Sequence, residues 1–483
     1  MIILMNVPNK YPFVNPKHPP LGLGYICSYL KSKNIDAEIY DLGAYPLSIN
    51  KAIDLMLGSK PEIVGLTCYE QNYFLIRRFC ELLKKKDISI KTVIGGPAAT
   101  FAYKKILVDT PYIDFCVQGE GEYTLLELYN NLNGTSDDFY NIKGISFKNK
   151  NEIITTENRS FIKNLDSIPS PYLERIFDMK YYDMANLISG RGCPMKCIYC
   201  TCGAMFGGVR FHSPKRILEE IDYLYELNNK IHWQKGPFLF TFIDDTLTIS
   251  KKQINSILDG LEKRNYNISW AGETRIMQIT KEILVRMKNN GLKSVTFGLE
   301  SADPYVLKIL KKVSSKGDDL TVEKKFLEKF KEVIKWTKEL KIQTFVSFIL
   351  GSPFETYENA KKTIEFCSKN QKEFGIIPIP NILVPFHGTE VFKRYKEFDM
   401  SVKEHPDFLL PYYINKYSKI DIKHIIELIP KDSQFFVFDE IFSRSLHVFK
   451  KLKKKEFFKS SEEFRKFLLK KQFISPEIPS GVY

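Results

Sequence analysis

The stretch "SGRGCPMKCIYCTCG", residues 189–203, places four of the chain's nine cysteines within ten positions. Cys193, Cys197 and Cys200 have the spacing C-x3-C-x2-C, and the nearby glycines and proline favour a loop that folds back on itself. Short cysteine-rich loops of this kind hold iron–sulfur clusters through thiolates. Three thiolates leave one iron of a four-iron cluster without a ligand from the loop, and such an open position can bind a substrate. We therefore interpret these three cysteines as metal ligands at a catalytic centre.

Three alternatives remain at this point. Cys202 could be a fourth ligand, which would close the cluster and indicate electron transfer, although we interpret it as a bystander. A structural zinc site usually pairs two C-x2-C units across a longer loop, and four sulfurs within ten residues fit a tetrahedron poorly. A disulfide is the third alternative. The other five cysteines stand singly in apolar patterns and are predicted to be core residues (Cys27, Cys68, Cys80, Cys116 and Cys367).

Around this loop, residues 184–395 alternate strand-like and helical segments. Six apolar runs predict parallel strands: "MANLIS", "FLFTFI", "NISWAG", "LKSVTFGL", "QTFVSFIL" and "IIPIPNILV". Six βα units predict a partial barrel, and the chemistry of such barrels lies on loops at the carboxyl ends of the strands. The cysteine loop follows the first strand at that end.

The first 135 residues show a second βα pattern. Five apolar runs, beginning with "IILMNV", alternate with helical segments and predict an α/β, flavodoxin-like doubly wound domain. Ligands of such sheets bind beyond the carboxyl ends of the strands. The candidate binding residues at those ends are Thr67, Tyr69, Glu70, Gly95, Gly96, Pro97, Gly119 and Glu120.

The two remaining segments differ from these domains. Residues 136–183 are predicted to be a linker with a hairpin at "GISFKNKNEIITT". Residues 396–483 are aromatic and rich in lysine without βα alternation, and we expect a small, mainly helical region there.

Composition narrows the class of protein further. The formal net charge is +14, but the lysines lie mostly in helix-like stretches and no nucleic-acid-binding motif accompanies them, so we expect no nucleic-acid partner. No run of about 18 apolar residues predicts a membrane span, and the opening "MIILMN" is typical of a buried strand rather than a signal peptide. Ordinary cysteine usage favours a reducing, cytoplasmic location.

The segment Cys193-Pro-Met-Lys-Cys197-Ile-Tyr-Cys200 resembles the C-x3-C-x2-C motif of the radical S-adenosylmethionine (radical SAM) superfamily. The resemblance implies a [4Fe–4S] cluster on the three cysteines, with S-adenosyl-L-methionine (SAM) on the fourth iron. One electron then cleaves SAM to methionine and a 5′-deoxyadenosyl radical. It also implies a reductant partner such as flavodoxin or ferredoxin.

The same resemblance implies SAM contacts at later strand ends. Tyr199 would contribute to the adenine pocket, and Arg275 would pair with the SAM carboxylate, which suits a guanidinium fork. The further residues implied are Asp244, Asp245, Glu300, Ser301 and Gly351. Phe354 and His387 depart from the family pattern, because glycine is common at the first position and proline or a small residue at the second.

Residues 1–135 resemble the cobalamin-binding domain that precedes many radical SAM domains, through "PPLGLGYICSYLKSKNIDAEIYDL", "GGPAAT" and "VQGEGEYTLLEL". The D-x-H-x-x-G motif that supplies a cobalt-binding histidine is absent. The resemblance therefore implies cobalamin bound without that ligand. The alternative is a domain that has lost cobalamin and serves as a scaffold.

Together these resemblances predict a cobalamin-dependent radical SAM methyltransferase. It would move a methyl group from methylcobalamin to an unactivated carbon, or to phosphorus, of a peptide or small-molecule natural product. One alternative is a cyclase or rearrangement enzyme with the same cofactors. Another is a non-enzymatic iron–sulfur or zinc protein.

Overall fold

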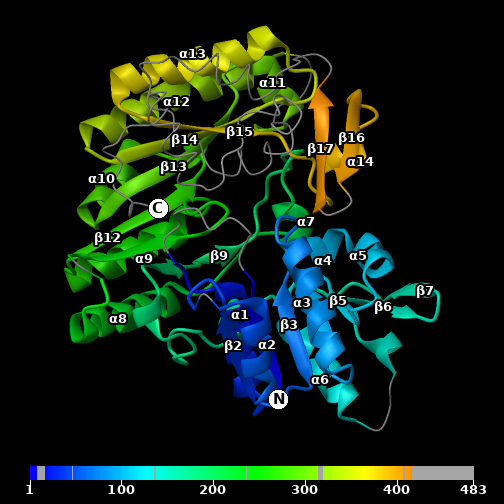
Figure 1. Cartoon of the computed structure of the whole chain (residues 1–483). Coiled ribbons are helices and arrows are strands. Elements are labelled where there is room, and N and C mark those ends of the chain that lie inside the picture. The colour runs from blue at the N-terminus through cyan, green and yellow to red at the C-terminus, as the bar shows by residue number, and fades with distance from the viewer. Residues whose placement is uncertain are drawn as a thin grey trace, which may run out of the picture.

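The structure is a computed structural model of the 483-residue chain. It describes residues 1–7, 17–45, 47–134, 138–234, 236–313, 319–405 and 408–415. Two large sheets, each covered by helices, make up this part of the chain (Figure 1). The N-terminal sheet is drawn in blue and cyan, and the central sheet in green and yellow.

The N-terminal sheet has seven strands in the order β2-β1-β3-β4-β5-β6-β7. These are β1 (Ile2–Asn6), β2 (Ala37–Asp41), β3 (Ile63–Thr67), β4 (Lys91–Gly95), β5 (Phe115–Val117), β6 (Ile145–Asn149) and β7 (Glu152–Thr155). The first five are parallel, and their order 2-1-3-4-5 is that of a flavodoxin-like fold. This confirms the predicted doubly wound domain.

Helices cover both faces of this sheet, because its strands are apolar on both faces. The helices are α1 (Leu21–Ser32), α2 (Ile49–Leu57), α3 (Tyr73–Lys86), α4 (Pro97–Phe101), α5 (Tyr103–Asp109) and α6 (Glu122–Leu132). Along β1, Ile3 and Met5 pack in the core cluster of α2 and α3, whereas Ile2 and Leu4 pack in that of α1 and α6. Two buried faces require a continuous apolar run rather than an alternating one.

The central sheet has six parallel strands in sequential order, which is the predicted partial barrel. They are β8 (Ala185–Leu187), β11 (Phe238–Phe242), β12 (Ile268–Thr274), β13 (Leu292–Glu300), β14 (Gln343–Leu350) and β15 (Ile377–Ile382). A two-stranded ribbon of β9 (Gly190–Arg191) and β10 (Arg210–Phe211) follows β8.

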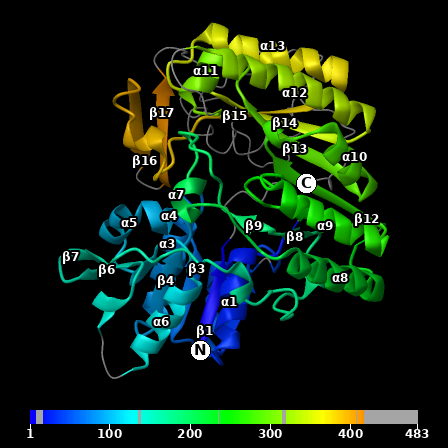
Figure 2. The same ribbon diagram turned by 180° about the vertical axis from the view of Figure 1, so that it is seen from behind.

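Helices of the central domain connect these strands. They are α7 (Cys202–Phe206), α8 (Pro214–Ile231), α9 (Lys251–Arg264), α10 (Lys281–Asn289), α11 (Pro304–Ile309), α12 (Thr321–Glu339), α13 (Tyr357–Phe374) and α14 (Glu390–Lys393). Four short 3-10 turns complete the described elements: η1 (Phe139–Asn141), η2 (Leu165–Ser167), η3 (Met179–Tyr181) and η4 (Ile276–Gln278). Viewed from behind, β9 and α7 lie at the junction between the two sheets (Figure 2).

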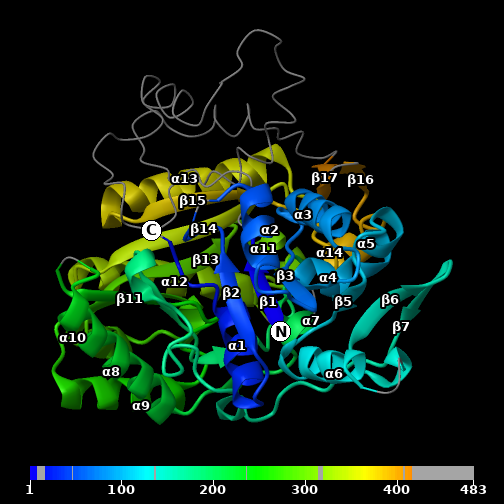
Figure 3. The ribbon, with the colours of Figure 1, turned by 60° about the horizontal axis from the view of Figure 1, so that its bottom comes forward.

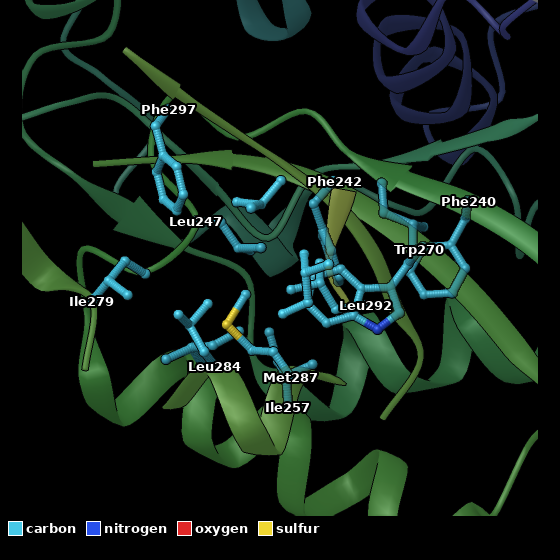
Figure 4. Close-up of a cluster of buried hydrophobic side chains, with 14 of the residues drawn as sticks. Phe240, Phe242, Leu247, Ile257, Trp270, Ile279, Leu284, Met287, Leu292 and Phe297 are labelled. Atoms are coloured by element: carbon cyan, nitrogen blue, oxygen red, sulfur yellow. The ribbon is translucent and has the colours of Figure 1, made fainter. Parts of the chain in front are cut away.

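Aromatic and branched side chains fill the space between the central sheet and its helices (Figure 4). Trp270 is fully buried, lies edge-on to Phe242 at 5.6 Å between ring centroids, and donates a 2.7 Å hydrogen bond to the carbonyl of Asn290. The same core cluster extends to Leu21 and Tyr25 on α1 of the N-terminal domain. The two domains therefore share buried apolar surface.

Two segments lie outside the two βα patterns: residues 136–183, with a predicted hairpin, and residues 396–483, with a predicted helical region. The predicted hairpin forms as β6 and β7, and β6 pairs with β5, so the hairpin extends the N-terminal sheet. Figure 3 shows this hairpin at the opposite side of the molecule from α8 and α10.

The predicted helical character of residues 396–483 is wrong for residues 400–415. There β16 (Met400–His405) and β17 (Phe408–Asn415) form an antiparallel hairpin. The sequence "HPDF" places a turn-forming proline and aspartate between two runs that contain valine, isoleucine and aromatic residues, which favour strands. Residues 416–483 lie outside the described residues.

The five isolated cysteines are all buried, as predicted, and all nine thiols are free. None of the helices in the described part of the chain has both the length and the apolar character that crossing a bilayer requires.

Trp270→Phe should lower the midpoint of thermal unfolding by about 5 °C. The substitution leaves the buried carbonyl of Asn290 without its donor, which costs about 2 kcal/mol. The matched control is Trp233→Phe, because the indole N–H of Trp233 has no acceptor among the described residues. Equal shifts for the two variants would contradict the importance of the Trp270 hydrogen bond.

Candidate functional site

The cysteine loop leaves and rejoins the central domain through a narrow neck. Arg191 and Arg210 are direct partners in the antiparallel β9–β10 ribbon. Residues 192–209 therefore form a loop whose two ends lie side by side. Gly192 has a φ of +94°, and a Cβ atom there would lie 2.8 Å from the carbonyl oxygen of Gly208. Only glycine accommodates this conformation and this close approach. The glycine before the first cysteine is thus required by the geometry of the neck.

Cys193, Cys197 and Cys200 are the three cysteines of this chain that are not buried. Two of their sulfurs receive N–H donors: the guanidinium of Arg275 lies 3.8 Å from the sulfur of Cys197, and the amide of Cys202 lies 3.4 Å from that of Cys200. Hydrogen bonds to sulfur are typical of iron–sulfur sites and tune their reduction potential. The loop thus presents three accessible, unpaired thiols in a polar setting.

The three thiols do not converge on a single point in this structure. Among the described residues, no three His, Cys, Asp or Glu side chains converge on one ion position, as a zinc site would require. Each thiolate of a four-iron cluster binds a different iron, so three such sulfurs need not converge on one point. Burial raises the pKa of Cys193, and raises that of Cys200 to about 11. Cluster binding therefore displaces thiol protons.

Cys202 differs from these three thiols. It is buried, and burial followed by the neighbouring carboxylate of Asp245 raises its pKa strongly. Its place at the start of α7 gives it a packing role, which supports its interpretation as a bystander.

Asp244 and Asp245, which follow β11, reach back to the cysteine loop. The carboxylate of Asp244 accepts bonds from the amide (3.0 Å) and hydroxyl (2.6 Å) of Ser189, and burial raises its pKa to about 6. Asp245 accepts a 3.3 Å bond from the amide of Gly192. Both acids therefore position the start of the loop. The SAM contacts predicted for them stay predictions.

A buried ion pair lies where β13 ends. The ammonium of Lys312 lies 2.8 Å from Glu300, and both side chains are almost fully buried. A Cβ atom on Gly298 would lie 2.3 Å from the carboxylate and 2.6 Å from the ammonium, so the pair lies directly over this glycine. Arg275 donates to the carbonyl of Lys312. The sequence did not predict Lys312 as a site residue, because "KILKK" has the pattern of solvated surface lysines.

The other predicted SAM residues lie in the same region of the central domain. The pKa of Tyr199 is raised well above its ordinary value by burial and by Glu300. The hydroxyl of Ser301 lies 3.1 Å from that of Thr363 in the core. Gly351 and Ser352 donate their amide hydrogens to Glu355, so this carboxylate shapes the loop after β14.

Phe354 in that loop has a φ of +56°, a conformation that glycine adopts without strain. The usual glycine at this position therefore has a conformational reason, and this chain retains the conformation with a phenylalanine. The phenylalanine ring packs against Phe398, with 6.1 Å between ring centroids.

At the carboxyl edge of the N-terminal sheet, several predicted residues border open space. Cβ atoms added to Gly95 and Gly119 would have no neighbour within 4 Å. Tyr69 is 48% exposed, yet burial raises its pKa. Tyr69 thus stands at this edge with part of its side chain accessible. Thr67, Gly96 and Pro97 lie at the same edge, where β3 ends and α4 begins.

A carboxylate of the central domain shows the same combination. Glu273, at the end of β12, is exposed. Its pKa is nevertheless raised, first by burial and then by Glu300 and Asp245. The influence of Glu300 and Asp245 places this carboxylate near the ends of β13 and β11. Both sheet edges therefore carry accessible side chains.

Glu70 and Glu120 were predicted to contact the ligand of the N-terminal domain, but their described contacts join the two domains. Glu70 accepts bonds from the backbone N–H of His387 (2.8 Å) and lies 3.1 Å from Nδ1 of its ring. Glu120 lies 2.8 Å from both Arg191 and Arg210. His387 and the two arginines were missed as their partners, because pairing across about 70 to 317 residues leaves no local pattern.

A three-cysteine loop at the first strand of a parallel partial barrel, next to the ligand-binding edge of a flavodoxin-like domain, defines the class. These are the features of a radical SAM enzyme with a corrinoid-binding domain. Family models agree: the Radical SAM superfamily matches residues 187–367, and the B12 binding domain matches residues 14–129. The chain belongs to the radical SAM enzymes that carry a cobalamin-binding domain.

Two relatives support this assignment, and a solved structure shares the fold. An uncharacterized methyltransferase of Pyrococcus horikoshii is 29% identical over 380 residues, covering 78% of each chain. The anaerobic magnesium-protoporphyrin IX monomethyl ester cyclase of Rubrivivax gelatinosus is 26% identical over 358 residues, covering 71% of this chain and 61% of the cyclase. The cobalamin-dependent SAM radical enzyme OxsB, solved with aqua-cobalamin and SAM, has a TM-score of 0.69 at 18% identity, covering 98% of this chain and 71% of OxsB.

Cys197→Ala should abolish the cluster, whereas Cys202→Ala should retain it. The first variant removes one of the three accessible thiols predicted to be ligands, and the second removes a buried thiol that faces Asp245. Iron and sulfide content and visible absorption after anaerobic reconstitution measure the outcome. Loss of the cluster in Cys202→Ala would show that Cys202 is a fourth ligand.

The apo protein should lose stability as the pH rises from 6 to 9, and Glu355→Gln should reduce this loss. Burial raises the pKa of Glu355 to about 8, although the amides of Gly351 and Ser352 donate hydrogen bonds that stabilise the carboxylate and lower its pKa. The folded chain therefore keeps a proton that the unfolded chain releases, and this contribution disappears as the pH passes through 8.

Thermal unfolding of both proteins at pH 6 and pH 9 measures the effect. Glutamine keeps an oxygen acceptor for the two amides without the charge. The midpoint of thermal unfolding of Glu355→Gln, taken relative to that of the wild type, should be several degrees higher at pH 9 than at pH 6. The same difference at both pH values would contradict the shifted pKa.

Proposed function

We propose that this protein is a cobalamin-dependent radical SAM methyltransferase that acts on an unactivated carbon, or on phosphorus, of a peptide or small-molecule natural product. The main observation is the direct bonding between the carboxyl edges of the two domains, through Glu70 with His387 and Glu120 with Arg191. These contacts bring the edge that would hold cobalamin next to the loop that would hold the cluster.

When bound, the cluster and SAM supply a 5′-deoxyadenosyl radical, and cobalamin supplies the methyl group. The chain positions these groups and excludes water from them. Cys193, Cys197 and Cys200 would hold the cluster, and Asp245 fixes the loop through the amide of Gly192. The chain's own hydrogen bonds thus help to position the loop.

For SAM, the proposed contacts come from the ends of β12 to β14 and from the cysteine loop. The guanidinium of Arg275 already lies near Cys197 and is a suitable partner for the carboxylate of SAM. Tyr199, Ser301 and the backbone at Gly351 would surround the adenosyl group. Lys312 neutralises Glu300, so that pair adds no net charge beside the ligand.

For cobalamin, the backbone of Gly95 and Gly119 is proposed as the approach surface of the corrin ring, since an added Cβ at either glycine would meet no atom within 4 Å, and Tyr69 lies at the same edge. Thr67, Gly96 and Pro97 would contact the same ligand from neighbouring strand ends. Glu70 and Glu120 take a different role here, because their carboxylates bond to the central domain. They would border the corrinoid site and join it to the cluster loop.

Methyl transfer is preferred to cyclisation because the methyltransferase relative matches at higher identity and over more of its own length than the cyclase. We further propose a cytoplasmic location, since all nine thiols are free. Flavodoxin or ferredoxin would supply the electron.

Anaerobic reconstitution with cluster, cobalamin and SAM tests the proposal. We expect bound corrinoid, 5′-deoxyadenosine, S-adenosylhomocysteine and, with candidate peptide or small-molecule substrates, a product heavier by the ~14 Da of a methyl group in place of hydrogen. Formation of 5′-deoxyadenosine without a methylated product would favour the cyclase or rearrangement alternative. Protein that cleaves no SAM and holds zinc would contradict the proposal.

A further inference from the structure

Four charged side chains at the domain junction form one buried network, which we call the neck clamp: Glu120, Glu122, Arg191 and Arg210. Arg191 donates to Glu120 and to Glu122, each at 2.8 Å. Arg210 donates to the second oxygen of Glu120, also at 2.8 Å. The carboxylates are 3% and 4% exposed, and the guanidiniums 9% and 13%. The two positive and two negative charges balance.

The two arginines face each other across the neck of the cysteine loop. They are register partners in the β9–β10 ribbon, at the start and at the end of residues 192–209. Like charges directly opposite on paired strands repel each other. The single carboxylate of Glu120 offsets this repulsion, because one of its oxygens accepts from each arginine.

Further contacts hold the side chains of this network in place. Glu120 also accepts the backbone N–H of Ile162 at 2.8 Å, and Arg210 also donates to the carbonyls of Ile162 and Phe206. The guanidinium of Arg191 lies 5.1 Å from the ring centroid of Tyr25. Although burial alone lowers the pKa of Arg191, Glu122 and Glu120 raise it overall, so it stays charged.

The clamp connects two proposed cofactor sites by a short path. Glu120 follows Gly119, which borders the open edge of the N-terminal sheet, and Arg191 lies two residues before Cys193. We propose that Glu120, Glu122, Arg191 and Arg210 are positioning residues that keep the neck of the cluster loop closed and set the separation of cluster and corrinoid. The part of this inference that concerns the two cofactors rests on the proposed function.

Hydrogen exchange of the apo protein tests the closure of the neck. In Glu120→Gln, backbone amides of residues 190–193 and 209–211 should exchange at least about ten-fold faster, since the two arginines then repel each other. Glu120→Gln with Arg210→Gln should recover much of the protection, because the repulsion is removed. The matched control is Glu220→Gln, whose buried carboxylate pairs with Arg216 within α8.

Equal exchange in wild type and Glu120→Gln, an equal increase at the neck in Glu220→Gln, or no recovery in the double variant would each overturn the clamp. Glu122→Gln provides a milder variant should Glu120→Gln fail to fold. It removes one bond to Arg191, and exchange at the neck should rise by about three-fold.

Pulsed electron paramagnetic resonance of the reconstituted protein tests the separation of the cofactors. The dipolar coupling between the reduced cluster and Co(II) should give a narrow distance distribution in wild type and Glu220→Gln. It should give a broad one in Glu120→Gln at the same cluster and cobalamin content. An unchanged distribution in Glu120→Gln would overturn the positioning role.

Product ratios separate this inference from the proposed function. If the protein is a methyltransferase, methylated product per 5′-deoxyadenosine should fall at least about ten-fold in Glu120→Gln and stay unchanged in Glu220→Gln. An unchanged ratio in Glu120→Gln would overturn the positioning role. Absence of methylation in wild type would refute the proposed function, whereas the exchange measurement would still decide whether the clamp exists.

Discussion

The candidate site depends on one constraint: the cysteine loop must be closed at its neck while two arginines face each other there. A β-ribbon that pairs Arg191 with Arg210 would be unstable alone, because the like charges lie directly opposite each other. The carboxylate of Glu120 removes this instability and comes from the other domain. One carboxylate of the N-terminal domain thus contacts both ends of the cysteine loop.

The other contacts of the site reinforce this arrangement. Asp244 and Asp245 fix the start of the loop from the second strand of the barrel, and Glu70 joins the last barrel loop to the N-terminal sheet through His387. Glu300 and Lys312 neutralise each other over Gly298. Glu120 and Glu300 are each paired with a basic side chain, whereas Asp244 is held by hydrogen bonds from Ser189. Tyr69 and Glu273 stay exposed, and Gly95 and Gly119 have no atom near an added Cβ.

The sequence predicts the two parallel sheets because apolar runs of strand length and helical segments repeat locally. It predicts the metal loop because three ligands lie within eight residues. It does not predict that Glu120 and Glu70 bond across domains, because the partners are separated by long stretches of chain. Lys312 has the local pattern of a surface lysine, and only tertiary packing buries it. The hairpin at residues 400–415 was missed because lysine-rich surroundings favoured a helical interpretation.

The central claim is that three thiolates hold a cluster whose remaining iron binds SAM. Electron–nuclear double resonance of the reduced, anaerobically reconstituted protein with SAM labelled by 15N at its amino group tests it most directly. The account predicts a hyperfine coupling between the cluster and the labelled nitrogen. A fully assembled cluster that shows no such coupling at saturating SAM would contradict it.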